Sequence, residues 1–375
     1  MNYPSIIFNF AKLQSKQFIY KLLMLHSNKK RSFIALGKFL SQFSETETLR
    51  NENVLHNDLY FDAFQDLIQL SQSHNGWYTP ENVYFSIQSW ANALTEEHLD
   101  KWLSAYTFNV MESKTVGLVL AGNIPLVGFH DFLSVLISGH KVAVKLSSND
   151  QHLLPFLAKY LIACEPYLSE KITFVEGKLE NFDAVIATGS TNTSRYFEYY
   201  FKDKPSIIRK SRNSVAILNG SESKEQMVAL GEDIFRYFGL GCRNVSKLFV
   251  PKGYNFDAFF GGIFPYQDVI KYEKYANNYD YNKAVFLMSN FKLLDNEFMT
   301  IMEDSSYASP ISSVFYEYYE DLEQLKLRLA SDSEKIQCIV SNKITENSIA
   351  FGETQKPNLW DYADNVDTLA FLLNI

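Results

Sequence analysis

The chain has 375 residues, with 35 lysines and arginines against 43 aspartates and glutamates, so its formal net charge is −8. The hydrophobic fraction of 46% is too high for a disordered chain, and three cysteines are too few for a disulfide framework, which favours a reducing, cytoplasmic location. An acidic chain of this length has no broad electrostatic footprint for nucleic acid and has material for about two domains.

The first 23 residues have apolar side chains at helical spacing, which predicts an amphipathic helix. Lys12, Lys16 and Lys21 interrupt the apolar run, so it resembles neither a signal peptide nor a membrane span. Docking on the body and contact with a membrane surface both stay open for this helix. The longest apolar stretch, 116–137, has polar residues in its middle, so no transmembrane segment is expected.

Residues 30–112 have mostly helical patterns, and Thr79 followed by Pro80 is typical of a helix start. From residue 115 onward, short apolar strands alternate with helices, which indicates βαβ units and parallel sheets. The expected strands are 115–120, 141–145, 172–175, 182–188, 214–218, 246–251, 283–289, 311–316 and 336–341.

The apolar pattern breaks at 209–213, and we place a domain join there. We expect a helical segment at 1–75, α/β domains at 76–212 and 213–345, and a tail at 346–375 that packs back on the body.

Cys242 is the strongest candidate for a nucleophile. It lies on a turn flanked by glycine, which allows close approach of a substrate, and Arg243 beside it would favour the reactive thiolate. The alternative is that Cys242 is a small buried hydrophobe. That alternative is the expected role of Cys164 in an apolar helix and of Cys338 in an apolar strand.

Three turns follow predicted strands at the carboxyl edge of the first sheet, where α/β proteins bind cofactors and substrates. Asn123 would offer an amide donor, Lys145 ends a strand, and backbone N–H groups at Gly189 and Ser190 could face a phosphate. The alternatives are that asparagine simply forms a turn and that the lysine extends into solvent. No cluster of His, Cys, Asp or Glu has metal-ligand spacing, so no metal is expected.

These turns, in this order and spacing, resemble those of the aldehyde dehydrogenase superfamily over residues 80–375. The resemblance is carried by the Asn-x-Pro turn of AGNIP, the lysine of VAVKLSS, the TGST turn and the cysteine before SKLFVP. Within the superfamily, the chain resembles the acyl-CoA reductases of the LuxC type. This resemblance implies two Rossmann-like parallel-sheet domains with the active site between them, 76–212 binding a nicotinamide cofactor and 213–345 carrying the nucleophile.

The resemblance also implies roles for single residues. Cys242 matches the nucleophile, and Asn123 matches the amide that forms an oxyanion hole with the Cys242 N–H group. Lys145 matches the lysine bound to the adenosine ribose. Gly189 and Ser190 match the turn near the cofactor's pyrophosphate and nicotinamide.

The sequence departs from the superfamily pattern in three places. Ser148 stands where NAD-preferring members often carry a glutamate, and since serine does not repel a 2′-phosphate, NADPH is the implied cofactor. Residues 207–212 lack the glutamate with which hydrolytic members activate water. A reductase that starts from a thioester does not need this base. The element that binds the nicotinamide ribose is unrecognisable; its expected place is 303–310, with Glu303 or Asp304 as candidates.

The implied activity is NADPH-dependent reduction of a fatty acyl-CoA, or of an acyl-carrier substrate, to a fatty aldehyde through an acyl-cysteine. An acyl-protein synthetase or acyltransferase is the implied partner. Two other classes stay open: an oxidative aldehyde dehydrogenase, and a non-reducing acyl-transfer or acyl-binding component of a biosynthetic assembly. The acyl chain length, the acyl donor and the oligomeric state, a homo-oligomer included, are not determined by the sequence.

Overall fold

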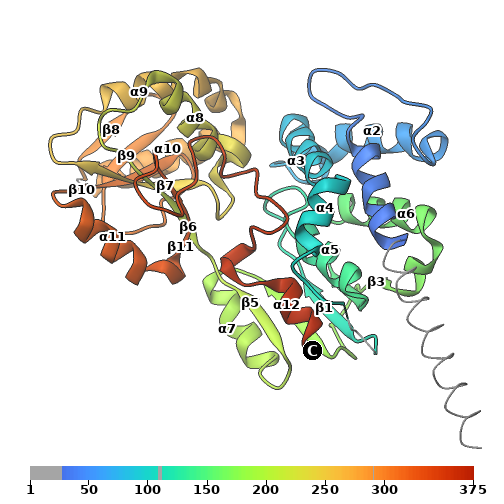
Figure 1. Cartoon of the computed structure of the whole chain (residues 1–375). Coiled ribbons are helices and arrows are strands. Elements are labelled where there is room, and N and C mark those ends of the chain that lie inside the picture. Colours follow the sequence, from blue (N-terminus) through green and yellow to red (C-terminus); the bar gives the residue numbers. More distant parts are fainter. Residues whose placement is uncertain (1–27, 109–111, 290) are drawn as a thin grey trace, which may run out of the picture.

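Two β-sheets, each flanked by helices, organise the chain (Figure 1). The computed structural model describes residues 28–108, 112–289 and 291–375. The first sheet has five strands in the order β3-β2-β1-β4-β5, and the second has six in the order β11-β6-β7-β10-β9-β8. The predicted α/β fold with two Rossmann-like sheets is therefore confirmed.

All strands of the first sheet run parallel, with β1 in the centre between β2 and β4. From β1 the chain adds β2 and β3 on one side, and after β3 it crosses over to add β4 and β5 on the other side. The strand order therefore reverses direction between β1 and β4. The carboxyl ends of two such strands are the usual ligand site of an open α/β sheet. The elements are β1 (Thr115–Val119), α5 (Phe129–Ser138), β2 (Lys141–Lys145), α6 (Leu153–Cys164), β3 (Ile172–Phe174), β4 (Ala184–Thr188), α7 (Thr191–Tyr200) and β5 (Ser206–Arg209).

Helices before the first sheet share its hydrophobic core. Residues 28–40 are helical, and α2 (Asn57–His74), α3 (Pro80–Ala93) and α4 (Glu96–Leu103) follow. The predicted start of α3 is confirmed, because the Thr79 side chain accepts the Asn82 N–H group.

The second sheet is parallel except at one edge. Strand β8 pairs antiparallel with β9, which corrects the expectation of an all-parallel sheet. The elements are β6 (Asn213–Ile217), α8 (Lys224–Phe235), β7 (Val245–Pro251), α9 (Asp257–Ile263), α10 (Glu273–Met288), β8 (Leu293–Asp295), β9 (Thr300–Glu303), β10 (Ser313–Tyr319), α11 (Leu322–Ser331) and β11 (Ile336–Val340).

The predicted strand at 283–289 is wrong, because these residues end helix α10. The buried side chains of this helix are Tyr275, Tyr279, Asn282 and Phe286, spaced by four, three and four residues. That spacing places them on one face of a helix. By itself the apolar run KAVFLM is as typical of a strand as of a buried helix.

The chain passes between the two sheets twice. Residues 210–212 join β5 to β6, and the C-terminal segment returns to the first sheet. In that segment Leu369 and Leu372, on α12 (Thr368–Leu373), are fully buried in the core of the first sheet. The ring Nε2 atom of His130 lies 2.8 Å from the Leu359 carbonyl oxygen. Two crossings and these contacts fix the sheets relative to each other.

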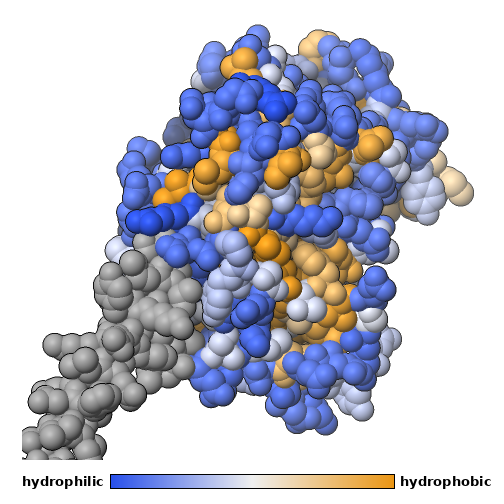
Figure 2. All heavy atoms as spheres, turned by 90° about the vertical axis from the view of Figure 1, so that its right-hand side faces the viewer, coloured by the Kyte–Doolittle hydropathy of each residue, from blue (hydrophilic) through white to orange (hydrophobic). Residues whose placement is uncertain are grey.

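No helix in the described part of the chain is long and apolar enough to cross a membrane. The amphipathic helix expected at 1–23 lies outside the described residues. Figure 2 shows the side of the molecule formed by the first sheet and its helices, where hydrophobic residues reach the surface among hydrophilic ones.

Candidate active site

The turn after β1 carries Asn123 and is held in place by the loop between α2 and α3. The Asn75 amide donates to the carbonyl oxygens of Gly122 and Asn149, at 3.1 Å in each case. The Tyr78 hydroxyl lies 3.0 Å from the carbonyl oxygen of Ile124. Nothing in the local sequence marks Asn75 or Tyr78 for this role, because their partners lie more than forty residues away.

Cys242 lies just before β7, at the amino-terminal edge of the second sheet. The Ser214 hydroxyl, from the start of β6, donates to the Cys242 carbonyl oxygen at 2.9 Å. The Asn123 amide donates to the Leu240 carbonyl oxygen at 2.8 Å. The structure therefore brings the Asn123 turn of the first sheet against the Cys242 turn of the second, although 118 positions separate the two residues in sequence.

Cys242 is exposed as a whole residue, yet enough protein surrounds its thiol for burial to dominate the thiol pKa. Burial raises its pKa to about 11; Arg243 lowers it, and Cys338 and Asp364 raise it further. Arg243 thus lowers the thiol pKa, as predicted, but the rise caused by burial is larger. Its guanidinium also donates to the Cys338 sulfur at 3.5 Å and to the Asp361 carbonyl oxygen at 3.3 Å.

The elevated pKa predicts how Cys242 reacts with an alkylating agent. Because a thiol with a pKa of about 11 is almost wholly protonated near neutrality, labelling by iodoacetamide should rise about tenfold per pH unit up to about pH 10. Peptide mass spectrometry at Cys242, with N-acetylcysteine as a reference thiol, measures the rate. A labelling rate that levels off between about pH 9 and pH 10, as that of the reference thiol does, would contradict the raised pKa of Cys242.

The candidate cofactor residues lie along the carboxyl edge of the first sheet. Lys145 ends β2 and is half-buried, Ser148 is exposed in the next loop, and Gly189 and Ser190 follow β4. A side chain at Gly189 would collide with Phe197, whose nearest ring atom would lie 2.9 Å from the added Cβ. The Ser190 hydroxyl caps α7 by accepting an N–H group at 3.2 Å.

The loops after β1 and β2 meet at Asp150, a further residue that the sequence did not reveal. Its carboxylate lies 3.1 Å from the Tyr78 hydroxyl and accepts backbone N–H groups from both loops, those of Leu126 and His152 among them. Burial raises the Asp150 pKa to about 6, while these hydrogen bonds act to lower it. Asp150 therefore joins the Asn123 turn to the loop that carries Ser148.

The segment 207–212 carries arginines instead of a glutamate, and a carboxylate reaches it from the C-terminal segment. The Asp364 carboxylate pairs with Arg212 at 3.1 Å, and its side chain is 10% exposed. It lies near enough to Cys242 to raise the thiol pKa. No local signal could have located Asp364, which is brought here by the docking of the C-terminal segment.

The expected ribose-binding region at 303–310 lies beside the start of β7. The Ser246 hydroxyl donates to the Tyr307 carbonyl oxygen at 2.7 Å, and Glu303 is exposed at the end of β9. Among the described residues, no group of three or more His, Cys, Asp or Glu side chains could hold a metal ion.

Several solved structures with a similar fold are aldehyde dehydrogenases. Aldehyde dehydrogenase 21 from Physcomitrella patens, in complex with the reaction product succinate, is 12% identical with a TM-score of 0.67, over 93% of this chain and 84% of that one. The Mycobacterium tuberculosis aldehyde dehydrogenase complexed with NAD+ is 14% identical with a TM-score of 0.60, over 87% and 76%. At this level of identity the likeness establishes the fold.

No curated protein sequence matches the chain. The family model for acyl-CoA reductase (LuxC) matches residues 70–258, which include the Asn123 turn, the carboxyl edge of the first sheet and Cys242. The chain belongs to the acyl-CoA reductase (LuxC) family.

Proposed function

We propose that this protein reduces a fatty acyl-CoA to a fatty aldehyde with NADPH, through an acyl-cysteine on Cys242. The observation that carries the proposal is the hydrogen bond from Asn123 to the Leu240 carbonyl oxygen, which joins the two sheets two residues before Cys242 in a chain of the acyl-CoA reductase family. In this proposal residues 76–212 bind the cofactor and residues 213–345 carry the nucleophile.

The Cys242 thiolate attacks the thioester carbonyl, whose oxygen takes up negative charge. The Asn123 amide has a second N–H group besides the one given to Leu240, and this group and the Cys242 N–H would stabilise the oxyanion. Each such donor contributes roughly 3–4 kcal/mol in comparable enzymes. When the tetrahedral adduct collapses, the CoA thiolate leaves, takes up a proton and leaves the acyl group on Cys242.

A nicotinamide cofactor would supply the hydride that reduces the acyl-cysteine. The residues present fit such a group: Lys145 and Ser148 at the end of β2 and Gly189 at the end of β4 lie at the carboxyl ends of the two strands that flank β1, and Gly189 has no side chain because Phe197 and Thr193 of α7 pack against it. After reduction, the carbon–sulfur bond breaks, the aldehyde leaves, and Cys242 regains its thiolate. Residues 207–212 carry no carboxylate of their own, and the Asp364 carboxylate that reaches them is paired with Arg212, so no free base would activate water there to hydrolyse the acyl-cysteine.

Purified protein with palmitoyl-CoA and NADPH tests the proposal. The nicotinamide absorbance should fall, and an aldehyde should be trapped in equal amount. Oxidation of a free aldehyde with NAD⁺, and no reduction of the thioester, would indicate an oxidative dehydrogenase. Acylation of Cys242 without consumption of NADPH would indicate an acyl-transfer component, and repeating the assay with an acyl-carrier protein identifies the donor.

Replacing Ser148 by Glu should shift cofactor preference toward NADH. A carboxylate at this exposed position would repel a 2′-phosphate and could accept hydrogen bonds from ribose hydroxyls. We expect the NADPH/NADH ratio of kcat/KM to fall by at least about tenfold, which is about 1.4 kcal/mol. Ser148→Gln, which adds similar bulk without charge, is the control; equal ratios in both variants would contradict the role of charge.

A further inference from the structure

The segment that connects α8 to β7 carries Cys242 and has an unusual backbone. Tyr237, Phe238 and Gly239 follow one another with positive φ angles of 55°, 57° and 76°. Positive φ brings the Cβ atom close to a carbonyl oxygen, so two successive aromatic residues in this region are strained. Such a conformation persists only where surrounding contacts enforce it.

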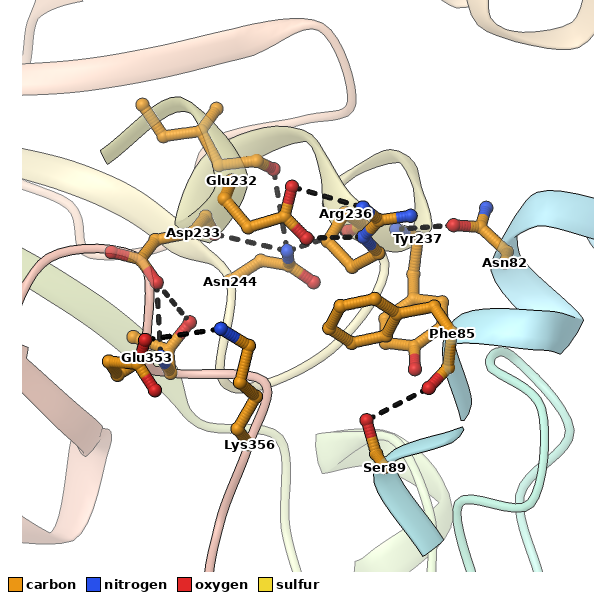
Figure 3. A network of polar contacts seen from close by, with 12 residues as sticks. Asn82, Phe85, Ser89, Glu232, Asp233, Arg236, Tyr237, Asn244, Glu353 and Lys356 are labelled. Carbon is orange, nitrogen blue, oxygen red and sulfur yellow. Dashed lines mark hydrogen bonds and ion pairs between the residues drawn. The ribbon is translucent and has the colours of Figure 1, made fainter. Parts of the chain in front are cut away.

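Asn244 supplies the first of these contacts. Its side chain is 3% exposed, and its Oδ1 atom accepts the Gly241 N–H group at 2.8 Å. Its Nδ2 atom donates to the carbonyl oxygens of Asp233 and Arg236, at 3.1 and 2.8 Å (Figure 3). One buried amide therefore joins the turn that contains Cys242 to the end of α8.

Asn82, on α3, supplies the second contact from the opposite side. Its side chain is buried, and its Oδ1 atom accepts the Tyr237 N–H group at 3.3 Å (Figure 3). The neighbouring Arg236 guanidinium pairs with Glu232 and lies 4.2 Å from the centre of the Phe85 ring, also on α3. Helix α3, which precedes the first sheet, therefore contacts the strained turn of the second.

Two hydrogen bonds of Leu240 connect the strained turn to Asn123. The Leu240 N–H group donates to the Tyr237 carbonyl oxygen at 3.1 Å, and the Leu240 carbonyl oxygen accepts the Asn123 amide. Tyr237 therefore determines where the Leu240 carbonyl meets Asn123. A shift of Tyr237 or of Gly241 would move Cys242 relative to Asn123.

We propose that Asn244 and Asn82 are positioning residues for Cys242, which together enforce the left-handed turn that sets the nucleophile against the Asn123 turn. The inference rests on the proposed role of Cys242 as the nucleophile. Both asparagines act through the backbone, Asn244 from the turn itself and Asn82 across the junction between the two sheets.

The first test compares Asn244→Ser with Asn57→Ser. Asn57 is also 3% exposed, and its amide donates to Gln42 and to the Asn51 carbonyl oxygen, within the N-terminal helical region. Both variants lose buried hydrogen bonds, so both should lower Tm. Only Asn244→Ser should lower kcat for acyl-CoA reduction, by about 10- to 100-fold per folded molecule, with KM within about threefold.

A second measurement is independent of the reaction. Because burial raises the Cys242 pKa, a loosened turn that admits water should make iodoacetamide labelling at pH 8 at least about fivefold faster in Asn244→Ser. Arg243, Cys338 and Asp364, which face the thiol, are unchanged in this variant. If the wild-type protein reduces no acyl-CoA, the proposed function fails, and the labelling rate still decides the role of Asn244.

The proposal would be overturned if Asn244→Ser had the kcat and the labelling rate of the wild-type protein and, like Asn57→Ser, differed from it only by a lower Tm. If Asn244→Ser does not fold, Asn82→Ala decides, since it removes only the side chain that accepts the Tyr237 N–H group. Asn82→Ala should lower kcat by about 3- to 10-fold, and it should make the labelling of Cys242 faster, as Asn244→Ser does. Unchanged values in Asn82→Ala would equally overturn the proposal.

Discussion

Replacing Cys242 by Ala should lower the rate of acyl-CoA-dependent NADPH oxidation by at least about 10³-fold, because the proposed mechanism carries the acyl group on the Cys242 sulfur. At the resting pKa of about 11, only ~10⁻⁴ of the thiol is ionised at pH 7. Attack on the thioester therefore requires loss of the thiol proton, and activity should rise with pH through the neutral range.

The matched control is Cys164→Ala. Cys164 is half-buried at the end of α6, and its pKa is likewise raised by burial to about 11. Cys164→Ala should retain turnover. Circular dichroism should show that both variants are folded. Single-turnover mass spectrometry with palmitoyl-CoA would locate the acyl group; turnover in Cys242→Ala, or acylation elsewhere, would refute the mechanism.

Replacing Arg209 by Met should lower the free energy of unfolding by about 3–5 kcal/mol. Arg209, at the end of β5, donates to both oxygens of Asp131, at 3.2 and 2.7 Å, and the two side chains are 6% and 8% exposed. It also donates to the Ala363 carbonyl oxygen and the Thr368 hydroxyl, both at 2.8 Å. Its removal leaves Asp131 charged and buried and releases the C-terminal segment.

Urea denaturation measures this loss, and Lys210→Met is the matched control. Lys210 is the next residue, and its ion pair with Glu198 is about half exposed on both sides, so it should contribute at most about 1 kcal/mol. The double variant Arg209→Met with Asp131→Leu should recover part of the lost stability, since no unpaired charge remains. Equal stabilities of Arg209→Met and Lys210→Met would show that the buried pair does not anchor the C-terminal segment.

The sequence by itself determined the alternation of strands and helices, because short buried strands and amphipathic helices have local hydrophobic periods. It also located the turns with Asn123, Gly189 and Cys242, because turns follow strand and helix ends and carry glycine, asparagine or proline. Where a run was short, as at 283–289, the local pattern did not separate a strand from a buried helix, and the prediction was wrong.

Only the tertiary structure decided which residues surround Cys242 and its turn. Asn244 and Arg243 adjoin Cys242 in sequence, but Asn82 and Asp364 come from α3 and from the C-terminal segment, on either side of it along the chain. Contacts between side chains and backbone atoms so far apart leave no periodic signal in the sequence. The burial that raises the Cys242 pKa has the same origin, because it depends on two sheets packing together around one exposed turn.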